Sequence, residues 1–441
     1  MLSYQEEEFG VITSERRCTM VMIKRRDVVS ISKWVDEVTI EEGSISRRRH
    51  STSVLSVRQL LGGCWFTSTC VNCSDVAELS VELESIIKVA DLESCTVPDS
   101  FEVEFYAGKL TLGSRTESPD VIDSSLSLLK EYKVPGYEPT LAIRRLRTIK
   151  TIRADDSTEA YEEKNLVEVE ASLRYREGLT RAVAVSRVLV QGLDKGVESA
   201  VEEAIRLARH RAKAMSLAKR PSITEVGKSE VILTREASPA FFHQLSHLLV
   251  GPRAREIVGR RLFEISEMRI YDSPGDLRKP TARFFDDEGV VARRRWLVEG
   301  FSIIDAHHNI RTAYEAGSSP GSAHGILGGI RLLHTSLVVE SGDWKDDELF
   351  EETKRGFVID SVNSVLLEPG SVRLIPQSAV RLERGDLGEP VFIKAVKIPI
   401  TRPIRVLGVG RTSYTTYSRE SEDIIVSETS PPIKIEAFIE I

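Results

Sequence analysis

The chain has 441 residues, a net charge of -7 at neutral pH, and 41% hydrophobic residues. This length predicts two or three domains with large cores, and the acidic balance provides no electrostatic footprint for nucleic acid. No apolar stretch approaches the ~18 residues that span a bilayer, and the segment Met1 to Glu8 is acidic where a secretory signal is basic and then apolar. We therefore expect a soluble, cytoplasmic protein without a nucleic-acid or membrane partner.

The first part of the chain is expected to be rich in strands and to contain one clear helix. Residues from Thr19 to Thr69 alternate apolar and charged side chains around a turn at Glu42-Gly43. The segment from Ser74 to Ala90 has a helical stripe of apolar residues, with Ser74 as its expected N-cap. Residues from Asp91 to Pro139 are rich in Ser, Pro and Gly, so we expect them to be irregular.

The periodicity then predicts a hairpin and a long helix. Residues 167–190 alternate around the turn Glu177-Gly178, which is typical of a hairpin with one wet face. Residues 197–219 keep helical spacing up to Pro221, and the chain after Glu225 reads as strands and turns. Strands around a few helices, without regular βαβ alternation, predict an α+β fold. We expect two domains, residues 1–220 and 221–441.

Five cysteines lie in the first hundred residues: Cys18, Cys64, Cys70, Cys73 and Cys95. In a cytosolic chain we expect them to be reduced and to pack as small hydrophobes. Cys70 and Cys73 form a C-x-x-C motif near Cys64, which leaves half a zinc site or a redox pair open as alternatives. The basic run Arg47 to His50 is expected to be a solvated turn.

Two histidines form the constellation that bears most directly on chemistry. His243 and His247 are four residues apart and would share a helix face, as a zinc pair requires. A metalloprotease helix also needs a carboxylate beside the first histidine, and here that position is Gln244, which cannot act as a base. A third ligand cannot be placed from sequence. A satisfied structural pair and a metal site therefore both remain open.

Two further groups of polar residues invite a structural interpretation. Asp286, Asp287 and Glu288 are clustered acids that could bind a metal, but the following Gly289 favours a turn. His307-His308 has no ligand spacing, so we expect a surface or packing role.

Several blocks, in order, resemble the TldD/PmbA family. The run Phe284 to Gly300, F-F-D-D-E-G-V-V-A-R-R-R-W-L-V-E-G, is similar to its D-D-E-G-v…L-I-e-n-G block. Ser318 to Ala323 resembles its S-T-G-N-A segment, and Leu337 to Gly356 resembles its L-x-i-x-x-G-D…E-E-L-i…G block. Lys228 to His247 is similar to the segment that enters the peptidase motif, and Val57 to Ser68 to the N-terminal v-R…G-g-W-G-f segment.

This resemblance implies two domains and a dimer. Active TldD-type subunits are metallopeptidases whose zinc is held by an H-E-x-x-x-H helix and a C-terminal cysteine. PmbA-type (TldE) subunits lack that motif and pair with TldD. The expected place of the C-terminal cysteine lies near Tyr417, and no cysteine follows Cys95.

Two registers match this chain to the family's zinc motif. In one, Phe242 stands for the first histidine, His243 for the glutamate, and Ser246-His247 for the final Gly-His. In the other, His243 is the first histidine, Gln244 replaces the glutamate and Leu248 replaces the second histidine. Neither register keeps both histidines or the glutamate. The motif is degenerate, so no catalytic residue or metal ligand is assigned.

The resemblance therefore favours a non-catalytic PmbA/TldE-like subunit of a cytoplasmic metallopeptidase that acts on short or unfolded peptides. We expect it to form a homodimer, or a heterodimer with a TldD-type subunit, and to hold extended peptide along a strand edge. No cofactor is expected in this chain, although catalytic relatives use zinc. The alternatives are an active metallopeptidase with a rearranged zinc site around His243, His247 and an unrecognised acid, or a stand-alone peptide-binding protein.

Overall fold

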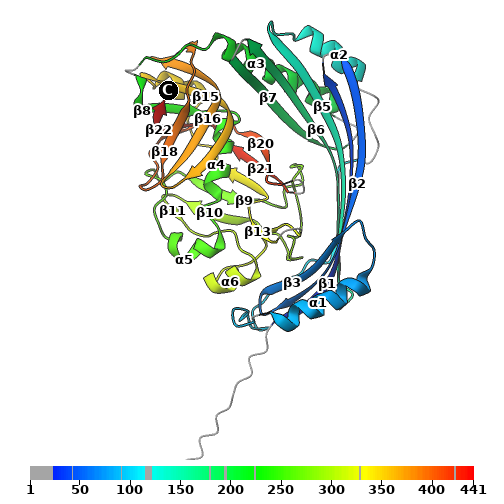
Figure 1. The fold of residues 1–441 in the computed structure, drawn as a ribbon. Helices are drawn as coiled ribbons and strands as arrows, with labels where there is room; N and C mark the ends of the chain where they lie inside the picture. Colours follow the sequence, from blue (N-terminus) through cyan, green and yellow to red (C-terminus); the bar gives the residue numbers. More distant parts are fainter. Residues whose placement is uncertain are drawn as a thin grey trace, which may run out of the picture.

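A computed structural model describes residues 23–41, 43–90, 92–114, 122–177, 180–192, 196–222, 225–326, 329–421 and 424–441. Long antiparallel strands of the N-terminal part curve along one side of the strand-rich C-terminal part (Figure 1). The α+β class expected from the sequence is confirmed. The expectations for Met1–Glu8, Cys18, Glu42 and Gly178 fall outside the described residues.

One sheet organises the N-terminal part. Its order is β3-β2-β1-β5-β6-β4, and β7 pairs with β6. All pairings are antiparallel except β4 with β6. The strands are β1 (Lys24–Glu41), β2 (Ser44–Leu61), β3 (Cys64–Val71), β4 (Gly108–Leu112), β5 (Tyr137–Ala154), β6 (Glu159–Glu177) and β7 (Thr180–Gln191).

Helices cover this sheet through small and branched apolar side chains. α3 (Val197–Leu217) lays Val201, Ala204 and Ala208 on β6 and β7, and all three are buried. α1 (Val76–Val89) buries Leu79 and Leu83 against the strands β2 and β3. α2 (Ile122–Glu131) packs beside α3. Fully burying one such branched side chain contributes roughly 1.5–3 kcal/mol, so these stripes fix the helices on the sheet.

Three local expectations for this part are wrong. Asp75, not Ser74, caps α1, because its carboxylate accepts hydrogen bonds from the backbone N–H groups of Ala77 at 2.9 Å and Glu78 at 3.0 Å. The segment expected to be irregular contains β4 and α2. The basic run Arg47 to His50 lies within β2 and not in a turn, because β1 pairs with it along its whole length.

The cysteine expectation is also corrected. Cys64 and Cys95 form a disulfide with Cα atoms 5.5 Å apart, and Cys70 and Cys73 form a second with Cα atoms 6.0 Å apart. The four thiols are therefore paired with one another and not reduced.

The C-terminal part contains two larger sheets. One has the order β11-β10-β9-β14-β21-β20, and the other has the order β15-β8-β22-β18-β16-β17, in which β15 also pairs with β16 and closes a small barrel. The strands are β8 (Gly227–Leu233), β9 (Arg269–Asp272), β10 (Arg295–Glu299), β11 (Ser302–Ile303), β12 (Ala323–His324), β13 (Arg331–Leu332), β14 (Ser336–Val339), β15 (Arg355–Glu368), β16 (Ser371–Glu383), β17 (Asp386–Pro390), β18 (Ala395–Pro399), β19 (Val406–Val409), β20 (Tyr414–Arg419), β21 (Ile425–Ser430) and β22 (Ile433–Glu440).

Short helices connect these sheets. They are α4 (Ala237–Ser246), the 3-10 helix η2 (Gly251–Arg253), α5 (Ala254–Ile257), α6 (Ile310–Ala316) and α7 (Asp346–Glu351). α4 contacts β15 and β16 of the barrel as well as β20 and β21 of the other sheet. Within the described ranges, no helix has the length and apolar character needed to cross a membrane.

The acidic turn at residues 286–289 links the two parts of the molecule. The Asp286 carboxylate accepts backbone hydrogen bonds from Glu288 at 2.9 Å and Val290 at 3.0 Å, and Gly289 has a φ of +86°. The turn predicted from the sequence is confirmed. Trp65 of the N-terminal sheet donates to Glu288 at 3.0 Å, and the Lys150 ammonium contacts Asp287 at 2.8 Å. These carboxylates thus fix how the N-terminal sheet docks on the C-terminal part.

Histidines 307 and 308 are both fully buried. The packing role predicted for them is therefore confirmed, and the surface alternative is wrong.

Candidate metal centre and central cleft

Helix α4 positions the two histidines singled out by the sequence. His243 lies in the last turn of α4, and His247 is the C-cap residue of this helix. Phe241 and Phe242 lie on the core side of the same helix, where both are buried and Phe242 packs near Phe263. This burial explains the rotation of α4, because the apolar face must turn inward and leaves both imidazoles facing β20 and β21. Phe242 therefore lies in the hydrophobic core and offers no ligand.

Three side-chain atoms converge in front of α4. Glu420, which directly follows β20, places its Oε1 2.7 Å from His243 Nε2 and 3.3 Å from His247 Nε2. The two imidazole Nε2 atoms are 3.3 Å apart. Ligands bound at about 2.0–2.2 Å around a tetrahedral zinc ion are separated by similar distances. Two imidazoles and one carboxylate form a donor set that zinc prefers, so these residues fit such an ion.

A second carboxylate holds the first imidazole in place. Glu428 on β21 is 1% exposed, and its Oε1 lies 2.6 Å from His243 Nδ1 and 3.0 Å from His334 Nε2. His334 Nδ1 in turn lies 2.9 Å from the hydroxyl of Ser246. A carboxylate on the outer nitrogen of a ligating histidine fixes the ring orientation and raises its basicity. Nδ1 of His243 is thus occupied, and Nε2 is directed at the converging atoms.

Without an ion, the same groups form a network of hydrogen bonds and ion pairs. Burial alone would disfavour the charged imidazole, but Glu428 and Glu420 outweigh it and raise the pKa of His243 to about 10. The imidazoles in turn lower the pKa of Glu420 below its usual range. A metal ion at this place would displace the proton on His243, since imidazole binds metal in its neutral form. The network has the hydrogen bonds that a structural pair requires, and the metal site stays a proposal.

This network predicts how the stability of metal-free protein depends on pH. Because the pKa of His243 is about 10 in the folded state and near 6.5 in the unfolded state, its contribution is complete below pH ~6.5 and is lost as the pH rises toward ~10. We expect the free energy of unfolding of chelator-treated protein to fall by a few kcal/mol between these values, at about 1.4 kcal/mol per pKa unit.

Urea unfolding at several pH values measures this loss, with His243→Gln and His210→Gln as a matched pair. His210 is exposed on α3, so its replacement should leave the pH dependence unchanged. A His243→Gln variant that keeps the wild-type pH dependence would contradict the assignment.

The cluster opens into a cleft between the N-terminal sheet and the C-terminal part. This central cleft has a volume of about 880 Å³ and is lined by residues of β1, β5, β6 and β7 on one side and of α4, β15, β16 and β20 on the other. His243, Gln244 and Tyr417 all line it. The Tyr417 hydroxyl is buried without a hydrogen-bond partner, and burial is the main cause that raises its pKa well above the usual range. It is therefore a neutral O–H donor.

The other carboxylates of the central cleft are each bound to an arginine. Glu37 contacts Arg144, Glu168 contacts Arg144 and Arg419, Glu170 contacts Arg187, and Glu236 contacts Arg211. An adjacent guanidinium stabilises the ionised carboxylate and weakens it as a proton acceptor. Glu236 is the exception, because burial outweighs Arg211 and raises its pKa, but it lies at the opposite end of α4 from His243. Gln244 also lines the cleft and cannot accept a proton. Among the described lining residues, a ready general base beside His243 is therefore missing.

The sequence found only part of this cluster. The spacing of His243 and His247 was informative because it is local to one helix. Glu420 is the acid that could not be identified from the sequence. It lies three residues after Tyr417, near which the resemblance placed the family's C-terminal cysteine. Glu428 and His334 were missed, since nothing in their local sequence marks them as neighbours of α4.

Comparison with known proteins relates the C-terminal part of the chain to a family and the whole chain to a fold. Residues 226–396 match the family model described as the PmbA/TldA metallopeptidase C-terminal domain. No curated protein matches the sequence. The fold is similar to TldE from Thermococcus kodakarensis, with a TM-score of 0.70 and 16% identity over 95% of this chain and 96% of that one.

Two further solved structures share the fold. One is described as a candidate modulator of a DNA gyrase from Thermotoga maritima, with a TM-score of 0.67, 16% identity, and coverage of 94% of this chain and 96% of that one. The other has a similar description and comes from Bacteroides thetaiotaomicron, with a TM-score of 0.65, 15% identity, and coverage of 95% and 96%. The matched C-terminal domain and the shared fold support a member of the TldD/PmbA family.

Proposed function

We propose that this protein is a metal-dependent peptidase of the TldD/PmbA family, with zinc held by His243, His247 and Glu420. The observation that carries the proposal is the convergence of these three ligand atoms within 3.3 Å of one another. The matched domain belongs to a metallopeptidase family, which agrees with this chemistry. Two histidines and a glutamate are also the ligands of known catalytic zinc sites. Bound zinc would polarise a carbonyl and lower the pKa of a water molecule.

The remaining residues of the central cleft have roles that follow from their chemistry. Glu428 orients the His243 ring through Nδ1. The Tyr417 hydroxyl is a donor suited to an oxygen on which negative charge develops. Strand β20 ends its sheet, since β21 is its only partner among the described pairings, and Thr416 to Arg419 line the cleft. An extended peptide can pair with this edge, which leads to Glu420. Short or unfolded peptides are therefore the proposed substrates.

Metal loading and peptide turnover together test this proposal. Chelator-treated protein should regain about one zinc per chain and should then cleave members of a pool of randomised hexapeptides, as followed by mass spectrometry. His247→Ala should lose both properties. Zinc-loaded wild-type protein that cleaves nothing in the pool would contradict peptidase activity.

A second candidate function rests on a different observation. Gln244 cannot take up a proton, and the other cleft carboxylates are bound to arginines. These features favour a non-catalytic subunit that contributes part of a peptide cleft to a dimer, either with itself or with a TldD-type chain. Light scattering of the purified protein, alone and with an H-E-x-x-x-H relative from the same cell, tests this role. A monomer in both cases would exclude it and would favour a stand-alone protein.

A further inference from the structure

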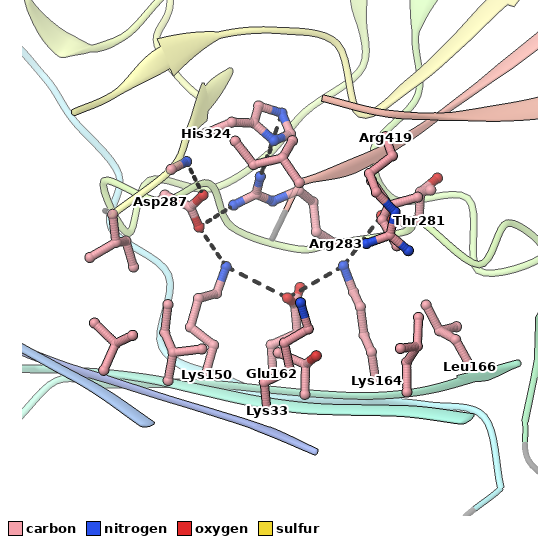
Figure 2. A pocket seen from close by; sticks show the side chains of 18 of the residues that line it. Lys33, Lys150, Glu162, Lys164, Leu166, Thr281, Arg283, Asp287, His324 and Arg419 are labelled. Carbon is pink, nitrogen blue, oxygen red and sulfur yellow. Dashed lines mark hydrogen bonds and ion pairs between the residues drawn. The ribbon is translucent and has the colours of Figure 1, made fainter. Parts of the chain in front are cut away.

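A second cavity lies next to the central cleft but away from the metal centre. It has a volume of about 240 Å³ and is enclosed between the face of β1, β2, β5 and β6 and the segments around residues 280–287, 324–326 and 424–425. Figure 2 shows Lys150, Glu162 and Lys164 rising from the N-terminal sheet toward Asp287 and Arg283 of the C-terminal part. We refer to this cavity as the basic pocket.

Positive charge exceeds negative charge among its lining residues. Two carboxylates, Glu162 and Asp287, face three cationic side chains in the cavity: Lys150, Lys164 and Arg283. Arg419 also lines the cavity, but it is paired with Glu168. The rest of the lining includes the apolar side chains Ile31, Val54, Leu146, Leu166, Ile326 and Ile424. Apolar walls with a few charged groups are typical of sites that bury a small ligand.

The two carboxylates do not neutralise this excess. Glu162 Oε1 lies 3.6 Å from Lys150 Nζ and 3.3 Å from Lys164 Nζ, and Asp287 Oδ1 lies 2.8 Å from Lys150 and 2.9 Å from Arg283. Each carboxylate is therefore shared between two cations. A cavity that keeps surplus positive charge among apolar walls is stabilised when an anion enters it.

The environment of Lys164 supports this view. Burial, together with the positive charges of Arg283 and Lys150, lowers the pKa of Lys164 to about 8. The negative charge of Glu162 opposes this shift but does not cancel it. The charged ammonium is thus under-compensated. In addition, Glu162 Oε2 is buried without a hydrogen-bond partner, which leaves an acceptor for an N–H group of a ligand.

The basic pocket adjoins the central cleft. Lys33, His50, Leu146 and Arg419 line both cavities, and Arg419 precedes the proposed metal ligand Glu420. A chain that passes these shared residues from the central cleft enters the basic pocket, whose size suits one terminal or near-terminal residue.

We propose that the basic pocket is a subsite for a peptide carboxylate, held by charge-assisted hydrogen bonds from Lys164 and its neighbouring cations. The route of the peptide through the cleft rests on the proposed function, whereas the anion chemistry of the pocket does not require bound zinc. The carboxylate comes either from the C-terminus of the peptide or from an acidic side chain close to it.

Binding to zinc-free protein tests the subsite without peptidase activity. Three pools of randomised hexapeptides serve as probes: neutral peptides with a free C-terminal carboxylate, the same peptides with a C-terminal amide, and amidated peptides with one Asp or Glu. Retention on the immobilised full-length protein is measured by mass spectrometry at low salt. The pools bearing a carboxylate should be retained about 10-fold more than the neutral amides, because hydrogen bonds to a charged group are stronger than those between neutral groups. Of the two pools that bear a carboxylate, the one retained more strongly reveals whether the C-terminus or an acidic side chain is bound.

Two lysine variants make the test specific. Lys164→Gln should remove most of this preference, while Lys88→Gln, an equal change of charge at an exposed position of α1, should preserve it. Equal retention of all pools, including no retention of any, would overturn the proposal, as would a preference that survives in Lys164→Gln. Separate zinc titration distinguishes the two ideas, since a carboxylate preference without zinc binding refutes only the metal-dependent function.

Discussion

Replacing Gln244 with glutamate should raise zinc-dependent peptide hydrolysis by roughly 10²- to 10⁴-fold, the usual contribution of a positioned general base. Gln244 follows His243 on α4 and lines the central cleft. A carboxylate has nearly the same shape as the amide but can accept a proton from the attacking water. The substitution therefore supplies the one group that the cluster lacks while leaving all three proposed ligands in place.

Turnover of the randomised peptide pool, measured on zinc-loaded proteins, checks this expectation. Gln244→Ala is the matched control, because it removes the amide without adding a base, and it should show no increase over wild type. If Gln244→Glu is no faster than Gln244→Ala, although both hold zinc, the cleft does not perform hydrolysis. The non-catalytic subunit would then be the better account.

Replacing Glu420 with glutamine should weaken zinc binding by more than about 100-fold. Loss of a partner that only supports a ligand typically costs 10- to 100-fold in affinity, and Glu420 is proposed as a direct ligand. Glu428→Gln should fall within that smaller range, because Glu428 contacts His243 only through Nδ1. Competition with a chromophoric chelator measures both affinities.

Glu170→Gln provides the control for this series. Glu170 also lines the central cleft, but it forms ion pairs with Arg187 and Arg144. Its replacement should leave zinc affinity unchanged. Equal losses in the Glu170 and Glu420 variants would show that the metal responds only to the overall charge of the cleft.

The sequence predicted elements whose signal is local. The helix now seen as α3 and the hairpin of β6 and β7 follow from periodicity within single segments, because their apolar positions recur regularly. The wet face expected for that hairpin is wrong for β6, where Glu168 is buried and pairs with Arg419 of the C-terminal part. The exposed run Arg47 to His50 has the composition of a turn, but pairing with β1 and the contacts of Arg47 and Arg49 with Asp36 impose a strand conformation. Pairing of this kind overrides composition.

The candidate site also combines a local sequence signal with contacts between distant segments. The spacing of His243 and His247 is a property of one helix, so it could be recognised in the sequence. Glu420 and Glu428 reach them only because β20 and β21 pair and pack against α4. The basic pocket depends on an even longer-range arrangement, because its lysines come from the N-terminal sheet and Arg283 comes from the C-terminal part. No local pattern encodes such neighbours.

X-ray absorption at the zinc edge of the purified, zinc-loaded protein tests the proposed metal centre. We expect one zinc per chain, coordinated by two imidazole nitrogens and carboxylate oxygen and without sulfur. His243→Ala should abolish this signal, whereas Lys88→Gln should retain it. Sulfur ligands, or failure of the wild-type protein to hold zinc at all, would contradict a metal centre at His243, His247 and Glu420.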